Sequence, residues 1–135
     1  MFISYSRVDR PIAERLAAAL EARGASVWMD KQLTGGSTFT DVTEEELNRS
    51  AKVIVLWSGA SVKSGWVRDE AQAGREQGKL VPLSIDGSQP PMGFRQIHMI
   101  DVVDWANGKG RELPREVIDA LALDSRAGPD RSSPA

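Results

Sequence analysis

The sequence predicts an α/β domain in which a five-stranded parallel sheet carries helices on both faces. Three observations predict it. The chain has 135 residues, the size of one ordinary domain. Short apolar runs alternate along it with amphipathic helical patterns, which is typical of βαβ units and a parallel sheet. One run, 52–57, is apolar almost throughout, as expected of a central strand buried on both faces.

Five strands are expected where such apolar runs are bounded by turn residues. The last run is weaker and more polar than the others, so we expect it at an edge of the sheet. With five strands in a doubly wound sheet, the flavodoxin-like order 2-1-3-4-5 is the expected topology. The expected strands are 2–5, 26–29, 52–57, 80–85 and 98–103.

Four helices are expected between and after these strands. Pro11 suits the first turn of the first helix, and Gly24 gives it a glycine stop. Asp41 and Ser64 are the expected N-caps of the second and third helices, and Gly78 ends the third. The expected helices are 11–23, 41–48, 64–77 and 113–123.

The remaining segments are expected to be loops. Segment 30–40 contains adjacent glycines, and 124–135 is rich in Ser, Pro and Gly, so we expect a domain over 1–123 followed by a disordered tail or linker. Doubly wound sheets bind ligands beyond the carboxyl ends of their strands. That rule places four segments around one rim, namely Ser6-Arg7, 30–40, Ser58-Gly59 and Asp86-Gly87.

The composition argues against several classes of function. The 17 basic and 19 acidic side chains give a net charge of −2, whereas binding to duplex nucleic acid needs a clearly basic surface. The absence of Cys excludes disulfides and thiolate nucleophiles, and the single histidine, His98, leaves no multi-His metal site. We therefore expect no bound metal, and an active site that depends on carboxylates.

No targeting or membrane signal is visible in the sequence. It opens MFISYSRVD, without the basic segment or the apolar core of a signal peptide. Its longest apolar run, 53–57, is far shorter than the roughly 20 residues of a membrane span. We therefore expect a soluble, cytoplasmic protein without a membrane partner.

Known phosphate-binding patterns do not fit the chain. The phosphate loop Gly-x-x-x-x-Gly-Lys-Ser/Thr is absent, and the sequence Gly108-Lys109-Gly110 lacks both a third glycine and the required place after the first strand. A phosphoacceptor receiver domain would need acidic residues where this chain has Ser6-Arg7 and Trp57-Ser58.

Trp66 and Glu70 form the densest candidate site. They are four residues apart and hence lie on one face of a helix, next to the expected rim. A ring beside a carboxylate could grip a cationic heterocycle or a ribose. The alternative is structural, with the ring anchoring the helix and the carboxylate solvated, and the spacing alone favours this alternative.

Four blocks of the sequence resemble the Toll/interleukin receptor (TIR) domain family in its bacterial form. They are FISYSRVD, SVWMDKQLTGGSTF, VIVLWSGASVKSGWVRDEAQAG, and LVPLSIDG with PPMGFRQ, and they follow the family's order from Phe2 to about Leu123. The family fold is a five-stranded parallel flavodoxin-like sheet, which agrees with the strand pattern above.

The resemblance implies an enzymatic activity. Many TIR domains cleave NAD and release nicotinamide, and a Glu in a Trp-x-x-x-Glu helix carries this activity. That pattern falls on Trp66 and Glu70, so Glu70 is the implied catalytic residue, with Asp69 adjacent but outside the matching position. NAD is then a substrate, and no cofactor is implied. The implied NAD-binding residues are Ser6, Arg7, Leu33, Gly35, Gly36, Phe39, Ser58 and Trp66.

This chemistry suits a site with a single carboxylate. Nicotinamide leaves NAD from a cationic state, so its glycosidic bond breaks without a general acid. An ionised Glu70 would stabilise the oxocarbenium-like ribose, and a position near a helix N-terminus would favour its charged form. We expect Glu70 at the rim, exposed to water.

The resemblance also implies self-association. Segment 30–40 matches the family's BB loop, which lines the NAD site and takes part in TIR–TIR assembly, so other TIR domains are expected partners in a homo-oligomer or filament. The expected function is cleavage of NAD to nicotinamide and ADP-ribose or a cyclic isomer, in bacterial defence or signalling. Two alternatives stay open: a non-catalytic TIR–TIR scaffold and, more distantly, an enzyme similar to nucleoside deoxyribosyltransferases.

Overall fold

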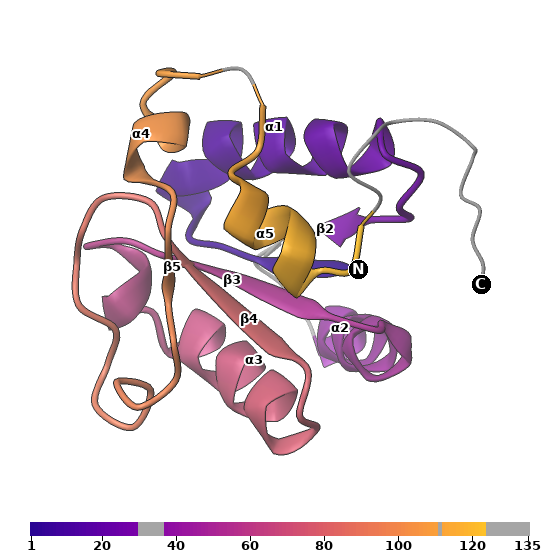
Figure 1. Cartoon of the computed structure of the whole chain (residues 1–135). Helices are drawn as coiled ribbons and strands as arrows, with labels where there is room; N and C mark the ends of the chain where they lie inside the picture. The colour runs from indigo at the N-terminus through magenta and orange to yellow at the C-terminus, as the bar shows by residue number, and fades with distance from the viewer. Residues whose placement is uncertain (30–36, 111, 124–135) are drawn as a thin grey trace.

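The sheet has the predicted topology. The computed structural model describes residues 1–29, 37–110 and 112–123. All strand pairs are parallel, and the order is β2-β1-β3-β4-β5, as expected (Figure 1). The polar fifth strand lies at an edge, as predicted. The strands are β1 (Phe2–Ser4), β2 (Trp28–Met29), β3 (Val53–Trp57), β4 (Leu80–Ser84) and β5 (Ile100–Asp101).

The helices cover both faces of the sheet, with α1 above it and α2 and α3 below it in Figure 1. Within the described residues, none of them has the length and apolar character needed to cross a membrane. The α-helices are α1 (Arg10–Glu21), α2 (Ser37–Arg49), α3 (Gly65–Glu76), α4 (Val103–Ala106) and α5 (Arg115–Ala120), and the 3-10 turns are η1 (Arg7–Asp9) and η2 (Ser61–Lys63).

Several predicted boundaries differ from those of the structure, and in two places the type of element differs as well. Helix α2 begins at Ser37, so the last part of the expected loop is helical and Asp41 lies inside the helix. Segment 102–106 turns into α4 instead of continuing the fifth strand. The Arg15 guanidinium holds this turn, because it donates to the carbonyls of Trp105 and Ala106 at 2.9 and 3.1 Å and lies over the Trp105 ring.

Alternation along the strands divides the core into two layers. Helices α1 and α5 pack on the face that carries Ile3, Ile54 and Leu56. Helices α2 and α3 pack on the opposite face. Its buried apolar side chains are Phe2, Leu47, Val53, Val55, Trp57, Val67, Ala71 and Phe94.

Helix α3 is fixed at both ends. Ser64 is its N-cap, as predicted, and its Oγ accepts a hydrogen bond from Val67 N–H at 3.2 Å. Gly78 follows the helix at φ +70°, which suits a glycine, and Lys79 N–H closes the last turn on Gly74 O. At Gly74 the helix runs so close to β3 that an added Cβ would lie 2.9 Å from Val53 Cβ.

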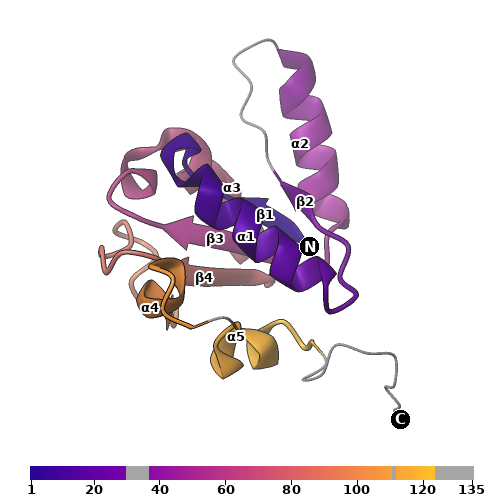
Figure 2. The same cartoon turned by 90° about the horizontal axis from the view of Figure 1, so that it is seen from above.

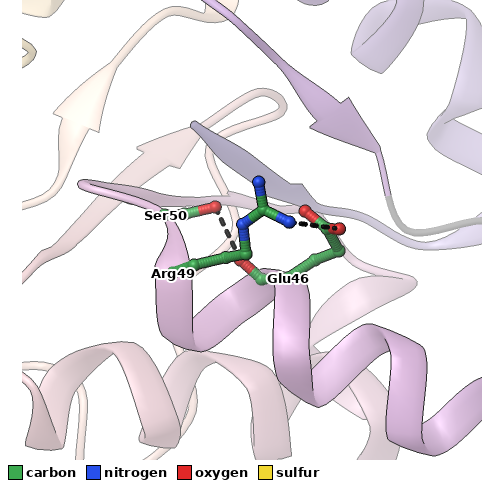
Figure 3. A network of polar contacts seen from close by, with 3 residues as sticks. All are labelled: Glu46, Arg49 and Ser50. Carbon is green, nitrogen blue, oxygen red and sulfur yellow. Dashed lines mark hydrogen bonds and ion pairs between the residues drawn. The ribbon is translucent and has the colours of Figure 1, made fainter.

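Lys79, the residue after Gly78, holds the end of α2 against α3. The Lys79 ammonium donates to the carbonyls of Leu47, Asn48 and Ser50 at 2.8, 3.2 and 2.6 Å. A cation there also offsets the negative end of the helix dipole. Figure 3 shows the same end from close by, where Ser50 Oγ donates to Glu46 O at 2.8 Å and Arg49 pairs with the Glu46 carboxylate at 3.4 Å.

Candidate active site

Glu70 lies under the sheet, where α3 meets the carboxyl end of β1. Phe2 packs on the α2–α3 face while Ile3 packs on the other, so the alternation of β1 directs Ser4 toward α3. Ser4 is fully buried, and its Oγ donates to Glu70 Oε1 at 2.5 Å. That distance lies at the lower limit of the range for a hydroxyl that donates to a carboxylate. Sequence analysis missed Ser4, although a serine in a buried strand signals a need for a polar partner.

Two expectations about Glu70 need correction. The side chain is 6% exposed and is not solvated at the rim. It is the sixth residue of α3, beyond the first turn, so the helix N-terminus adds little to its electrostatics. The carboxyl group is instead held by neighbours inside the fold, including Ser4.

A groove of about 380 Å³ between α2 and α3 brings Trp66 and Glu70 together; we call it the α2–α3 groove. The Trp66 ring remains 37% exposed at one end of it. Figure 2 shows the N-terminal end of α2 projecting away from the other elements, whereas its C-terminal end lies against the domain. The described lining residues are Thr43, Glu44, Leu47, Asn48, Trp66, Asp69, Glu70, Ala73, Glu76 and Gln77.

The charge of the α2–α3 groove is negative. Its described lining includes four carboxylates and no Lys, Arg or His. Such a lining favours a cationic group and disfavours a phosphate. A positively charged ring or a developing carbocation beside Glu70 therefore fits this groove, whereas a diphosphate would have to lie outside it.

A second polar cluster lies at the same edge of the sheet; we call it the Ser58 brace, made of Asp9, Ser58, Ser61 and Asp86. Ser58 Oγ donates to Asp9 Oδ2 at 2.5 Å and accepts from Ser61 N–H at 3.1 Å, and Ser58 N–H donates to Ser61 Oγ at 2.7 Å. Gly59 N–H donates to Asp86 Oδ2 at 2.9 Å. The brace thus ties together the segments that follow β1, β3 and β4.

The two carboxyl groups of the brace are shifted in opposite directions. Burial raises the pKa of Asp9 above its ordinary 3.8, the nearby Asp86 carboxylate adds to the rise, and the bond from Ser58 opposes it. Partial burial would also raise the pKa of Asp86. Hydrogen bonds from the backbone of Gly59 and from Ser88 outweigh this effect and lower the pKa of Asp86 below 3.8.

The remaining predicted site residues are distributed unevenly. Ser6 precedes η1 and its carbonyl accepts from Asp9 N–H at 2.8 Å, while Arg7 is exposed in η1. Ser58 is 3% exposed and its N–H and hydroxyl are used inside the brace, so this geometry does not present it to a ligand. Phe39 lies in α2. The predicted residues Leu33, Gly35 and Gly36 lie outside the described residues.

Comparison with known proteins identifies the family. The family model described as "TIR domain" matches residues 1–117, most of the chain. This description names no group of organisms, so the bacterial form stays a prediction. A comparison with curated protein sequences found no match.

Two solved structures are similar to the chain. One is the TIR domain of the Toll-related receptor TRR-2 from Hydra magnipapillata, with 21% identity and a TM-score of 0.67, over 77% of this chain and 84% of that one. The other is a metazoan TIR-STING receptor from C. gigas, solved in complex with 2′,3′-cGAMP. It has 25% identity and a TM-score of 0.66, over 89% of this chain but only 38% of the receptor.

Proposed function

Because the chain belongs to the TIR domain family, we propose that it is an NAD nucleosidase with Glu70 as its catalytic residue. One observation carries the proposal: the buried Glu70 and the partly exposed Trp66 line the same wall of the α2–α3 groove. That pair can hold a cationic ring and a ribose. A merely solvated carboxylate, the structural alternative for Glu70, does not fit a side chain that is 6% exposed.

The reaction needs only stabilisation of a developing cation. The bond between the ribose C1′ and the nicotinamide nitrogen breaks, and its electron pair stays on the nitrogen, so nicotinamide leaves neutral. Glu70 stabilises the resulting oxocarbenium-like ribose, and Trp66 offers a face on which the pyridinium ring stacks. In hydrolysis a water oxygen then bonds to C1′ and releases a proton; in cyclisation a nitrogen of the adenine takes the place of water.

We further propose that activity depends on self-association, in cytoplasmic defence or signalling. The diphosphate of NAD finds no cation in the described lining of the groove, so groups outside it must complete the site. A second TIR domain is the partner that the family offers, through the segment predicted as the BB loop. We propose in the same way that the product is ADP-ribose or a cyclic isomer of it, and that the defence is directed against phages.

The test is direct. Concentrated or artificially clustered protein is incubated with NAD, and free nicotinamide is measured by chromatography. Release that rises with clustering, and that Glu70→Gln abolishes, supports the proposal. If clustered protein releases no nicotinamide above a buffer blank, the proposal is wrong.

The acidic lining of the α2–α3 groove also favours a second candidate function. A TIR domain that only recruits other TIR domains could use such a groove to receive a basic segment of a partner. This scaffold would self-associate in light-scattering measurements while staying silent with NAD. Loss of that association at high salt, with no nicotinamide released under any condition, would favour it over the enzyme.

A further inference from the structure

We propose that Ser4 is a positioning residue for Glu70, which fixes the orientation of the carboxylate of this groove-lining residue. The inference rests on the proposed function and adds to it a residue from a different element, 66 positions away in sequence. Ser4 is a polar residue on an apolar face of the sheet, where its neighbours are apolar side chains such as Phe2, Val55 and Trp57.

The burial of Ser4 limits what its hydroxyl can do. Ser4 is 0% exposed and is not among the lining residues of the groove, so it cannot contact a substrate. A buried hydroxyl without a partner would be strongly unfavourable, and here the partner is Glu70 Oε1. Any influence of Ser4 on a reaction must therefore pass through Glu70.

Glu70 is a long side chain, and its reach makes orientation important. A glutamate has three side-chain torsions, and a hydrogen bond to one carboxylate oxygen selects among their combinations. Misplacement of a catalytic group by about 1 Å can slow a reaction roughly 100-fold. A hydroxyl donor also favours the charged form of a carboxylate, which is the form that a cationic intermediate requires.

The chain offers a matched control in Ser84. It is 3% exposed, it ends β4 at the same edge of the sheet, and its Oγ accepts from Gly87 N–H at 3.0 Å. Ser84→Ala thus removes a buried hydroxyl of similar surroundings without touching Glu70. A loss shared by both variants would report general destabilisation, whereas a loss confined to Ser4→Ala would report the bond to Glu70.

The experiment compares clustered wild-type protein, Ser4→Ala and Ser84→Ala in nicotinamide release. We expect Ser4→Ala to lower kcat about 10- to 100-fold while KM changes less than about 2-fold. We also expect the acidic limb of its pH–rate profile to move to higher pH, since the carboxylate has lost a donor. Ser84→Ala should keep the wild-type kcat and profile. The other titratable groups lining the groove, Glu44, Asp69 and Glu76, are the same in all variants.

Several outcomes would overturn the inference. An active wild type with an unchanged Ser4→Ala removes the role of Ser4, and so does an equal loss of kcat in Ser84→Ala. If Ser4→Ala does not fold, Ser4→Cys replaces it, because a thiol has nearly the same shape but is a weak donor; an unchanged kcat in that folded variant is equally decisive against Ser4. A silent wild type, in contrast, overturns the proposed function itself.

Discussion

The Ser4–Glu70 pair beside the α2–α3 groove and the Ser58 brace lie at the same carboxyl edge of the sheet, and both combine a serine with a carboxylate at 2.5 Å. They differ in their surroundings. Glu70 lines a cavity beside an exposed aromatic ring, whereas the donors of Ser58 are consumed by Ser61 and Asp9. The comparison teaches that a polar residue at the ligand-binding edge of a doubly wound sheet need not be a ligand contact. What distinguishes a site from a brace is a groove lined by the residue that carries the polar group.

The largest expected effect concerns Glu70. Glu70→Gln should lower the rate of nicotinamide release about 10²- to 10³-fold, because it removes the charge that faces the developing cation. The fold should persist, with a loss of about 1 kcal/mol in the free energy of unfolding, since glutamine still accepts the Ser4 hydrogen bond. Asp69→Asn, in the same groove but exposed, is the control and should keep most of the activity. A dead Asp69→Asn with an active Glu70→Gln would reverse the assignment.

Ser58→Ala tests the other side of the comparison. It removes a buried hydroxyl that serves Asp9 and Ser61, so we expect a loss of about 1–3 kcal/mol in the free energy of unfolding. The rate per folded molecule with NAD should stay near that of the wild type. Urea unfolding and the nicotinamide assay measure the two quantities. A variant with wild-type stability and no activity would show that Ser58 contacts the substrate after all.

Gly74→Ala tests how α3 is seated. Alanine favours a helix interior by up to about 1 kcal/mol over glycine, but the added Cβ would meet Val53 Cβ at 2.9 Å, and overpacking typically costs about 1–3 kcal/mol. We expect a net loss of about 1 kcal/mol in thermal unfolding, together with reduced activity as α3 and Glu70 move from β1. Ala71→Gly, also buried in α3, is a contrast that loses stability without pushing the helix outward.

The smallest expected effect is a pH dependence of the brace. Because the folded-state pKa of Asp9 is raised, its contribution to stability is fully present below the ordinary pKa of 3.8 and is lost as pH rises through the folded value. Asparagine does not titrate. The stability of wild type relative to Asp9→Asn should therefore increase from about pH 7 to about pH 4 in urea unfolding.

Asp86→Asn is the control for this pH dependence. The pKa of Asp86 is lowered, so its contribution is present above 3.8 and is lost as pH falls through the folded value. The difference between wild type and Asp86→Asn should therefore shrink on acidification. Two differences that change in the same direction would contradict the assignment of the brace.

The sheet could be predicted because each strand is a local apolar run bounded by turn residues. Apolar runs predicted the five strands, the doubly wound class supplied their order, and Ser64 and Gly78 marked the ends of α3. The start of α2 could not be predicted, since Ser37, Thr38 and Thr40 are poor helix formers next to a pair of glycines.

The candidate site divides in the same way. Trp66 and Glu70 share a helical face, so four-residue spacing predicted that they lie together. The hydrogen bond between Ser4 and Glu70 joins residues that are 66 positions apart, and the hydrogen bond from Ser58 to Asp9 joins residues that are 49 positions apart. Such pairings depend on how β1, β3 and α3 pack, which no local pattern encodes.

The turn at Gly78 and Lys79 closes one end of the α2–α3 groove. Lys79 donates to carbonyls at the end of α2 directly after α3 has ended, and Gln77 Nε2 donates to Asn48 Oδ1 at 2.8 Å. The two helices are therefore joined at the same end of the groove. A ligand longer than the groove must then extend out of its other end, near Trp66. Under the proposed function, the ribose beside Glu70 would leave the rest of the dinucleotide outside the domain, in reach of a neighbouring subunit.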